Sequence, residues 1–181
     1  MPMTDEPSVT RVERTFGFID ISRFTSYTDH EGDTAAVVAL AEFRSVVRDV
    51  ASHFGVRIDK WLGDGAMLVC VEIEPLVHAV TDIEVRLLQR GFPLPLRAGL
   101  STGLVILFEA EDYIGTPVNL ASRLCMEAEP GQTLATQEVA AYAPPGVRHQ
   151  PMGQLFLRGL ADPVSVVCLT ALVNAGAVAD C

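Results

Sequence analysis

The sequence has no apolar run near the roughly 20 residues that a membrane-spanning helix requires, so we expect no membrane span. Its first ten residues are polar and include two prolines, which is not the pattern of a secretory signal peptide. Basic residues are also scarce, because 13 lysines and arginines face 23 aspartates and glutamates, for a net charge of −10. This balance argues against a nucleic-acid partner, although a small anionic ligand needs only a few local cations or a metal.

Cysteine and histidine do not form clusters that would bind a metal. The four cysteines show no paired spacing, and three lie in apolar segments, where a reduced cysteine acts as a small apolar side chain. The four histidines are isolated from one another. We therefore expect a reducing, cytoplasmic setting. The residues concerned are Cys70, Cys125, Cys168, Cys181, His30, His53, His78 and His149.

Length and composition indicate one compact domain. The chain has 181 residues, of which 49% are apolar and 20% charged, and it contains no repeat or low-complexity block. We expect a folded domain over residues 14–172 between flexible tails at 1–13 and 173–181.

The hydrophobic pattern predicts an alternation of strands and helices. Strands are expected at 15–21, 56–62, 66–71 and 96–101, and helices at 33–53 and 75–90. This order is that of a ferredoxin-like βαββαβ sandwich, an α/β (α+β) fold. Further strands near 132–136, 152–157 and 164–170 are expected to extend the sheet.

Two carboxylates lie where predicted strands end. Asp20 lies in the apolar run 16–21, and Asp64 lies in a Gly-Asp-Gly hairpin turn. A helical crossover makes the first two strands parallel and the hairpin reverses the third, so both carboxylates should fall at one edge of the sheet. Each has an ordinary alternative, Asp64 as a turn residue and Asp20 as the cap of a helix starting near Ser22. Together they predict a site for Mg²⁺ or Mn²⁺, which prefer oxygen ligands.

A second polar group lies in the segment 112–123. Thr116 followed by Pro117 predicts a helix start, with a capping hydroxyl and then proline at the first helical position. Asn119 and Arg123 are four residues apart and share one face of that helix. They form either an ordinary exposed polar face or an anion site near the helix N-terminus.

These segments resemble signature motifs of the class III adenylyl and guanylyl cyclase catalytic domain. The motifs are Phe-Ile-Asp-Ile-Ser-Arg-Phe-Thr at 18–25, Lys-Trp-Leu-Gly-Asp-Gly at 60–65 and the whole segment 112–123. Two shorter matches, at 96–103 and 157–160, support them. The matches keep the family's order and span nearly the whole chain. The resemblance implies the class III nucleotide cyclase fold.

The resemblance also implies roles for the two carboxylates and their surroundings. Asp20 and Asp64 correspond to the metal-binding aspartates, and Ile21 corresponds to the residue whose backbone carbonyl contacts the metal. The family uses two ions of Mg²⁺ or Mn²⁺ in each active site. Three further positions around the nucleotide are Phe24, Thr25 and, by a looser alignment, Arg158.

Four residues correspond to the family's substrate and catalytic positions. Lys60 and Asp112 match the pair that reads the purine, Asn119 the residue that orients the ribose, and Arg123 the residue that stabilises charge on the α-phosphoryl group. Adenine offers an acceptor at N1 and a donor at its amino group, which complement a lysine and an aspartate, whereas guanine offers the reverse. We therefore expect ATP as substrate and cyclic AMP and pyrophosphate as products.

Alternative functions are a guanylyl cyclase, a catalytically weak or inactive nucleotide-binding regulatory domain, and a ferredoxin-like interaction module without a site. The resemblance further implies a head-to-tail homodimer with two composite active sites, since one chain carries every element. One departure concerns residues 104–111, where the family usually has a longer hairpin that reaches toward the partner. This shortening bears on the strength of the dimer.

Overall fold

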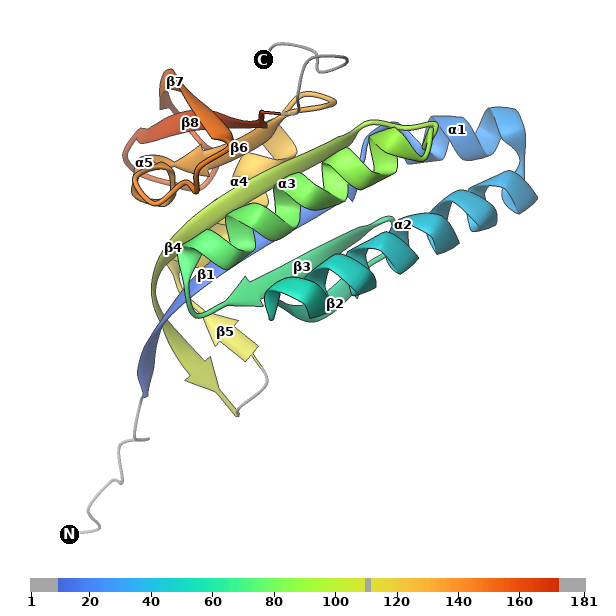
Figure 1. Ribbon diagram of the computed structural model, residues 1–181. Coiled ribbons are helices and arrows are strands. Elements are labelled where there is room, and N and C mark those ends of the chain that lie inside the picture. Colours follow the sequence, from blue (N-terminus) through green and yellow to red (C-terminus); the bar gives the residue numbers. More distant parts are fainter. Residues whose placement is uncertain (1–9, 110–111, 173–181) are drawn as a thin grey trace, which may run out of the picture.

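One mixed sheet organises the molecule. The computed structural model describes residues 10–109 and 112–172, and its strands form a single sheet with the order β2-β3-β1-β4-β6-β8-β7, while β5 pairs with β4 (Figure 1). The strands are β1 (Arg11–Ile21), β2 (Arg57–Leu62), β3 (Gly65–Cys70), β4 (Leu96–Phe108), β5 (Asp112–Ile114), β6 (Thr133–Thr136), β7 (Val147–Leu155) and β8 (Val164–Ala171). The helices are α1 (Phe24–Glu31), α2 (Asp33–Phe54), α3 (Ile73–Gln89), α4 (Thr116–Glu127) and α5 (Gln137–Ala140).

The predicted βαββαβ order and mixed α+β class are confirmed. β1 lies between β3 and β4 and is antiparallel to both, and β2 is antiparallel to β3. β1 and β2 therefore run in the same direction, as the predicted helical crossover requires. Among the described residues, no helix has the length and apolarity to cross a bilayer.

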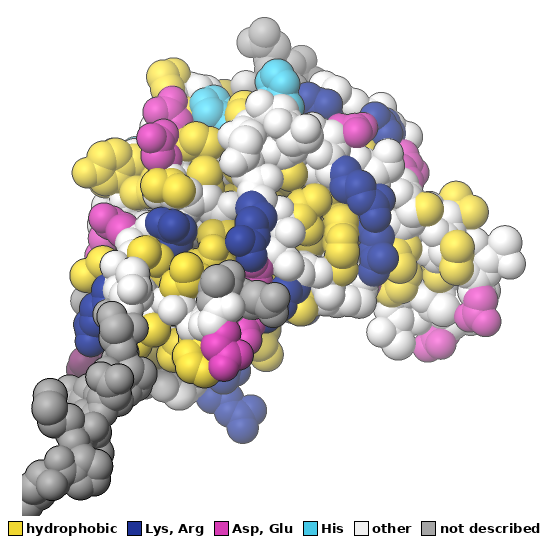
Figure 2. All heavy atoms as spheres, turned by 90° about the horizontal axis from the view of Figure 1, so that it is seen from below, with side chains coloured by type: hydrophobic (Ala, Val, Ile, Leu, Met, Phe, Trp, Pro, Cys, Tyr) yellow, Lys and Arg dark blue, Asp and Glu magenta, His cyan; other side chains and the backbone are white. Residues whose placement is uncertain are grey.

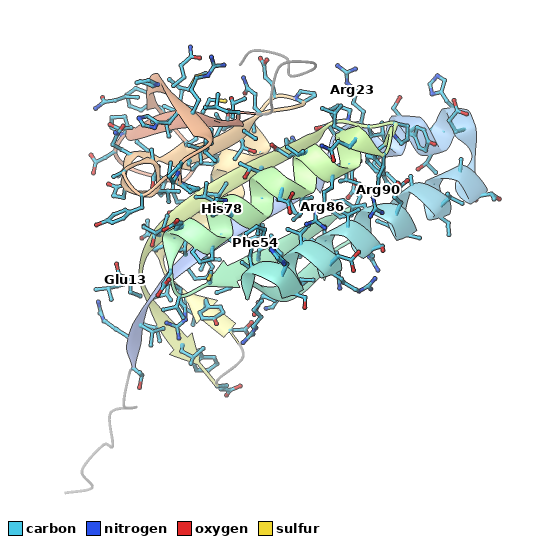
Figure 3. The ribbon with its side chains drawn as sticks, in the orientation of Figure 1. Glu13, Arg23, Phe54, His78, Arg86 and Arg90 are labelled. Carbon is cyan, nitrogen blue, oxygen red and sulfur yellow. The ribbon has the colours of Figure 1, made fainter. Side chains whose placement is uncertain are left out.

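The two faces of the sheet carry different helices. α2 and α3 cover one face and enclose the largest core, to which β1 contributes Ile19 and Ile21 (Figure 1). α4 packs on the opposite face, where Phe16 and Phe18 of β1 point. At the far end of the α2–α3 pair, the rings of Phe54 and His78 stack with centroids 5.4 Å apart (Figure 3). Because side chains alternate along β1, Asp20 lies on the α4 side of the sheet.

Several boundaries differ from the predicted ones. The strand predicted at 96–101 continues to Phe108, because Val105 is buried against the α4 face and the strand ladder with β1 extends to Ile106. Residues 11–13, predicted as part of a tail, belong to β1. β7 begins at Val147 rather than near 152 and ends at Leu155. Cys70 and Cys125 are free thiols as expected, but Cys168 is disulfide-bonded, which the sequence pattern did not predict.

Candidate active site

The structure brings Asp20 and the turn that carries Asp64 to one edge of the sheet. Asp20 pairs with Gly65, and the backbone N–H of Ile21 donates to the carbonyl of Asp64 at 3.1 Å. Gly65 has no room for a side chain, because a Cβ there would lie 2.6 Å from the carbonyl oxygen of Ile19 and 3.1 Å from Oδ1 of Asp20. The turn is therefore pressed against the carboxylate. The predicted convergence of the two aspartates is what the fold produces.

The alternative role of Asp20 as a helix cap does not fit the structure. α1 begins at Phe24, its N-cap is Arg23 in a left-handed conformation, and no side chain caps it. Figure 3 shows Arg23 projecting outward from the turn after β1. Asp20 therefore does not cap α1.

The two carboxylates repel each other. The pKa of Asp64 is raised, first by partial burial and next by the negative charge of Asp20, against smaller opposing effects of a backbone hydrogen bond and of Arg97. A cation between the carboxylates would relieve this repulsion. Their oxygen atoms suit Mg²⁺ or Mn²⁺. No group of three or more His, Cys, Asp or Glu side chains that could hold a metal ion occurs in residues 10–109 and 112–172.

Arg97 is a site residue to which sequence reasoning assigned no role. Its Nε and Nη2 both donate to Oδ2 of Asp20, at 2.9 and 2.7 Å, and Nη1 donates to the carbonyl of Met126 at 3.3 Å. Its pKa is raised, chiefly by the hydrogen bond to Asp20. The register of β1 and β4 places Asp20 directly opposite Arg97, so a correct prediction of that pairing would have found the contact. The guanidinium therefore neutralises part of the negative charge of the acidic pair.

Lys60 and Asp112 form an ion pair although 52 residues separate them in the sequence. Lys60 is the only lysine of the chain and follows an irregularity in the pairing of β2 with β3. Asp112 opens β5, and both side chains are about half exposed. The structure therefore brings together the two residues that the family resemblance assigns to the purine.

A second contact between β2 and β5 supports this pair. Arg57 forms an ion pair with Asp59, whose side chain is 1% exposed, and its guanidinium lies 5.9 Å from the ring centroid of Tyr113. Tyr113 in turn packs edge-on against Phe16 of β1, with centroids 5.3 Å apart. The strands that carry Lys60 and Asp112 are therefore also joined by packed side chains, those of Arg57, Tyr113 and Phe16.

α4 presents Asn119 and Arg123. Its N-cap is Gly115 and no side chain caps it, so the predicted capping role of Thr116 is wrong, whereas proline does occupy the first turn. The helix lies so close to β4 that a Cβ on Gly99 would meet the carbonyl oxygen of Ala121 at 2.2 Å. In the described part of the chain, the side chains of Asn119 and Arg123 make no hydrogen bond or ion pair with either aspartate or with Lys60 and Asp112.

The three remaining predicted residues are not gathered around the carboxylates by any hydrogen bond or ion pair within the described residues. Phe24 is partly buried against the large core at the start of α1, and Thr25 beside it is exposed. Arg158 is exposed in the loop between β7 and β8.

Comparison with known proteins identifies the fold. No family model matches the chain. The chain is 39% identical over 150 residues to the uncharacterized protein Rv2212 of Mycobacterium tuberculosis, a match that covers 82% of this chain and 39% of that protein. Over 81 residues it is 41% identical to the pH-sensitive adenylate cyclase MT1302 of the same species, covering 44% of this chain and 20% of that one. The crystal structure of the adenylyl cyclase CyaB from P. aeruginosa superimposes with a TM-score of 0.78 and 26% identity, over 92% of this chain and 97% of that chain.

The chain has the fold of a class III nucleotide cyclase catalytic domain. The matching solved structures include guanylyl as well as adenylyl cyclases, so the fold alone does not set the base. The chain spans well under half the length of the first curated relatives it matches.

One arginine holds the turn that carries Asp64. Nη2 of Arg44, on α2, donates to the carbonyl of Gly63 at 3.0 Å, and its guanidinium lies 4.9 Å from the ring centroid of Trp61. Arg48, one turn further along α2, also stacks on Trp61, at 5.1 Å, but within the described residues it makes no hydrogen bond to the turn. Arg44 therefore stacks on Trp61 and also hydrogen-bonds to Gly63, the residue before Asp64.

We expect Arg44→Met to weaken Mn²⁺ binding by about tenfold, because a hydrogen bond from a charged group contributes about 1.5–3 kcal/mol and the freed turn must be ordered by the ion. Arg48→Met is the matched control and should leave the affinity unchanged. Trp61 is the only tryptophan, so titrating its fluorescence with Mn²⁺ follows the turn in both variants. Equal losses in the two variants would assign the effect to stacking rather than to the bond with Gly63.

Proposed function

We propose that this domain is an adenylyl cyclase, which converts ATP into 3′,5′-cyclic AMP and pyrophosphate. The observation that carries the proposal is the placement of Asp64 beside Asp20 at one sheet edge, where partial burial and then the negative charge of Asp20 raise the pKa of Asp64. Such a pair is suited to hold Mg²⁺ or Mn²⁺ together with the phosphates of a nucleotide. Residues 14–172 form the catalytic domain in this proposal.

The reaction is an in-line displacement at the α-phosphorus. The ribose 3′-oxygen forms a bond to that phosphorus, its proton passes to solvent, and the bond to the departing pyrophosphate breaks. Asp20, Asp64 and the backbone carbonyl of Ile21 would hold two ions, which when bound lower the pKa of the attacking hydroxyl and neutralise the phosphates. Asn119 orients the ribose, and Arg123 compensates the charge that develops on the α-phosphoryl group.

Base selection rests on Lys60 and Asp112. The ammonium group donates to N1 of adenine, and the carboxylate accepts from the 6-amino group. Their ion pair supports this role, because it brings together one donor and one acceptor, the two kinds of group that the edge of adenine requires. Guanine would present a donor to the lysine and an acceptor to the aspartate. Donor would then face donor and acceptor would face acceptor, which weakens binding of guanine relative to adenine.

The active sites are proposed to form between two chains in a head-to-tail homodimer. Asn119 and Arg123 make no hydrogen bond or ion pair with the aspartates of their own chain among the described residues, which a composite site would explain. The β4–β5 region exposes Leu104, Phe108 and Ile114 by 61%, 49% and 52%, an apolar surface suited to a partner. Figure 2 shows basic side chains in separate groups among apolar ones on one face of this acidic chain. The apolar side chains of such a face can pack against a second chain, and its basic side chains can pair with a triphosphate.

The test is an assay with ATP and with GTP, in Mn²⁺ and in Mg²⁺, over a wide range of protein concentrations. Cyclic AMP should form from ATP, with GTP disfavoured by about 10²-fold or more in kcat/KM, because guanine mismatches both the lysine and the aspartate. Specific activity should rise with protein concentration as dimers form. Nucleotide binding without turnover at any concentration would instead favour an inactive regulatory domain, and preferred use of GTP would overturn the base assignment.

A further inference from the structure

A cavity of about 670 Å³ lies at the end of the sheet where β4 begins. Its walls are the last turns of α3, the segment 92–96, and the end of β8. Among the described lining residues, Glu84 of α3 is the only ionisable side chain. The apolar lining includes Leu88, Phe92, Leu94, Leu96 and Leu169. The volume is within the range of about 300–1,000 Å³ that small-molecule sites occupy.

Glu84 is an unusual residue for this position. One carboxyl oxygen accepts a hydrogen bond from the hydroxyl of Thr133 at 2.6 Å, and Thr133 is fully buried. Burial raises the pKa of Glu84 to about 7. The basic residues that follow on α3 do not compensate it, because Arg86 is bonded to Asp82 at 2.8 Å and Arg86 and Arg90 lie on the side of α3 that faces α2 (Figure 3). The apolar cavity thus contains a single carboxyl group, which among the described residues is hydrogen-bonded to one hydroxyl, that of Thr133.

The cavity and the acidic pair lie on opposite faces of the same strand ends. Leu96 lines the cavity and pairs with Ile21, whereas the next residue, Arg97, points to the other face and holds Asp20. Pro95, also a wall residue, accepts a hydrogen bond from the backbone N–H of Ser22 at 2.9 Å. A molecule in the cavity would therefore touch the segment that fixes the end of β1.

We propose that this cavity binds an amphipathic organic cation, whose apolar body fills the chamber and whose amine pairs with Glu84. A charged partner offsets the cost of an ionised carboxylate in apolar surroundings. The apolar lining, together with Leu88 exposed by 55% at the wall, supplies the surface that the body of the ligand would bury. This binding does not depend on the function proposed above.

Dansylcadaverine, a fluorescent ring system on a five-carbon primary amine, is a suitable probe. We expect it to bind the nucleotide-free and metal-free chain with a blue-shifted, enhanced emission, and Glu84→Gln to weaken binding by about tenfold or more, as for loss of one buried charged partner. Glu74→Gln is the matched control, since Glu74 lies on the same helix but its side chain is 62% exposed. It should bind like the wild type. The N-acetylated probe, which has no charge, should bind the wild type no better than it binds Glu84→Gln.

The dependence on pH gives a second readout. The amine stays protonated below about pH 9, so affinity should rise between pH 6 and pH 8 as Glu84 ionises, and this rise should vanish in Glu84→Gln. Leu88→Lys provides a variant that leaves Glu84 intact and should repel the cationic probe but not the acetylated one. Equal binding to wild type and Glu84→Gln, or no binding to the wild type, would overturn the proposal.

Coupling to the metal site is tested separately, and this part rests on the function proposed above. Saturating dansylcadaverine should tighten Mn²⁺ binding by about fivefold, the low end of typical coupling, because it orders the ends of β1 and β4 before the ion arrives. The effect should be absent in Glu84→Gln. Probe binding with an unchanged Mn²⁺ affinity would retain the cavity as a ligand site and remove its regulatory role.

Discussion

Asp20→Asn and Asp64→Asn should each reduce cyclic AMP synthesis by about 10³-fold or more, since each removes a ligand from an ion that supplies several kcal/mol of transition-state stabilisation. The two variants should nevertheless differ in stability. Loss of the Asp20 carboxylate leaves Arg97 without the partner that receives two of its N–H groups, which costs about 1–3 kcal/mol of unfolding free energy. Loss of the Asp64 charge removes a repulsion, so its stability should not fall.

The pH dependence of Asp64 has a definite sign. Its folded-state pKa lies above the value of an unfolded chain, so the folded state holds the proton more tightly and stability falls as pH rises past the ordinary aspartate pKa. Asp64→Asn should abolish this loss, and at pH 8 in the absence of metal it should be at least as stable as the wild type. Calorimetric titrations measure the affinity for Mn²⁺, chemical denaturation at pH 4 and 8 measures stability, and the activity assay measures cyclic AMP synthesis. An active Asp20→Asn enzyme, or equal destabilisation by both substitutions, would contradict this account of the site.

The convergence of Asp20 and Asp64 was predictable because it needs only local information. The period-2 run that ends at Asp20, a helical crossover and a Gly-Asp-Gly hairpin together determine which strand ends meet. The structure confirms that topology, with Asp20 opposite Gly65. Hydrophobic periodicity and turn chemistry are therefore sufficient to predict that the two aspartates of the candidate metal site lie at the same edge of the sheet.

Contacts that depend on long-range register were not predictable in the same way. The Arg97–Asp20 bond joins residues 77 positions apart, and predicting it requires the residue-by-residue pairing of β1 with β4. Lys60 and Asp112 meet because β5 pairs with β4 yet also reaches β2, which only the family resemblance indicated. The expected hydroxyl cap at Thr116 failed because Gly115, in an extended backbone conformation, takes the N-cap position instead.

Mixing two inactive variants should restore activity if the proposed composite sites exist. Asp20→Asn removes the metal half of a site, and Arg123→Ala removes the phosphoryl half, so each homodimer is inactive. In an equimolar mixture, about half of the dimers are mixed, and each mixed dimer has one intact site and one doubly impaired site, so about a quarter of the wild-type activity should return. Arg123 is suited to this test because its side chain has no hydrogen bond or ion pair among the described residues, and its loss should spare the fold.

The matched controls are mixtures in which both substitutions fall in the same half. In the proposed sites, one chain supplies the two aspartates and the other supplies the purine pair, Asn119 and Arg123. Asp20→Asn with Asp64→Asn, or Lys60→Ala with Arg123→Ala, should therefore recover nothing, because every site of a mixed dimer lacks one residue of the half in question. Assays at rising total protein concentration distinguish weak dimerisation from a wrong assignment of the site. If weak dimerisation limits the recovered activity, that activity must increase with protein concentration. A mixture of Asp20→Asn and Arg123→Ala that stays inactive while mixed dimers are seen by native mass spectrometry would show that the aspartates and Arg123 do not serve one site. Recovery in a same-half control would show that the halves are divided differently between the two chains.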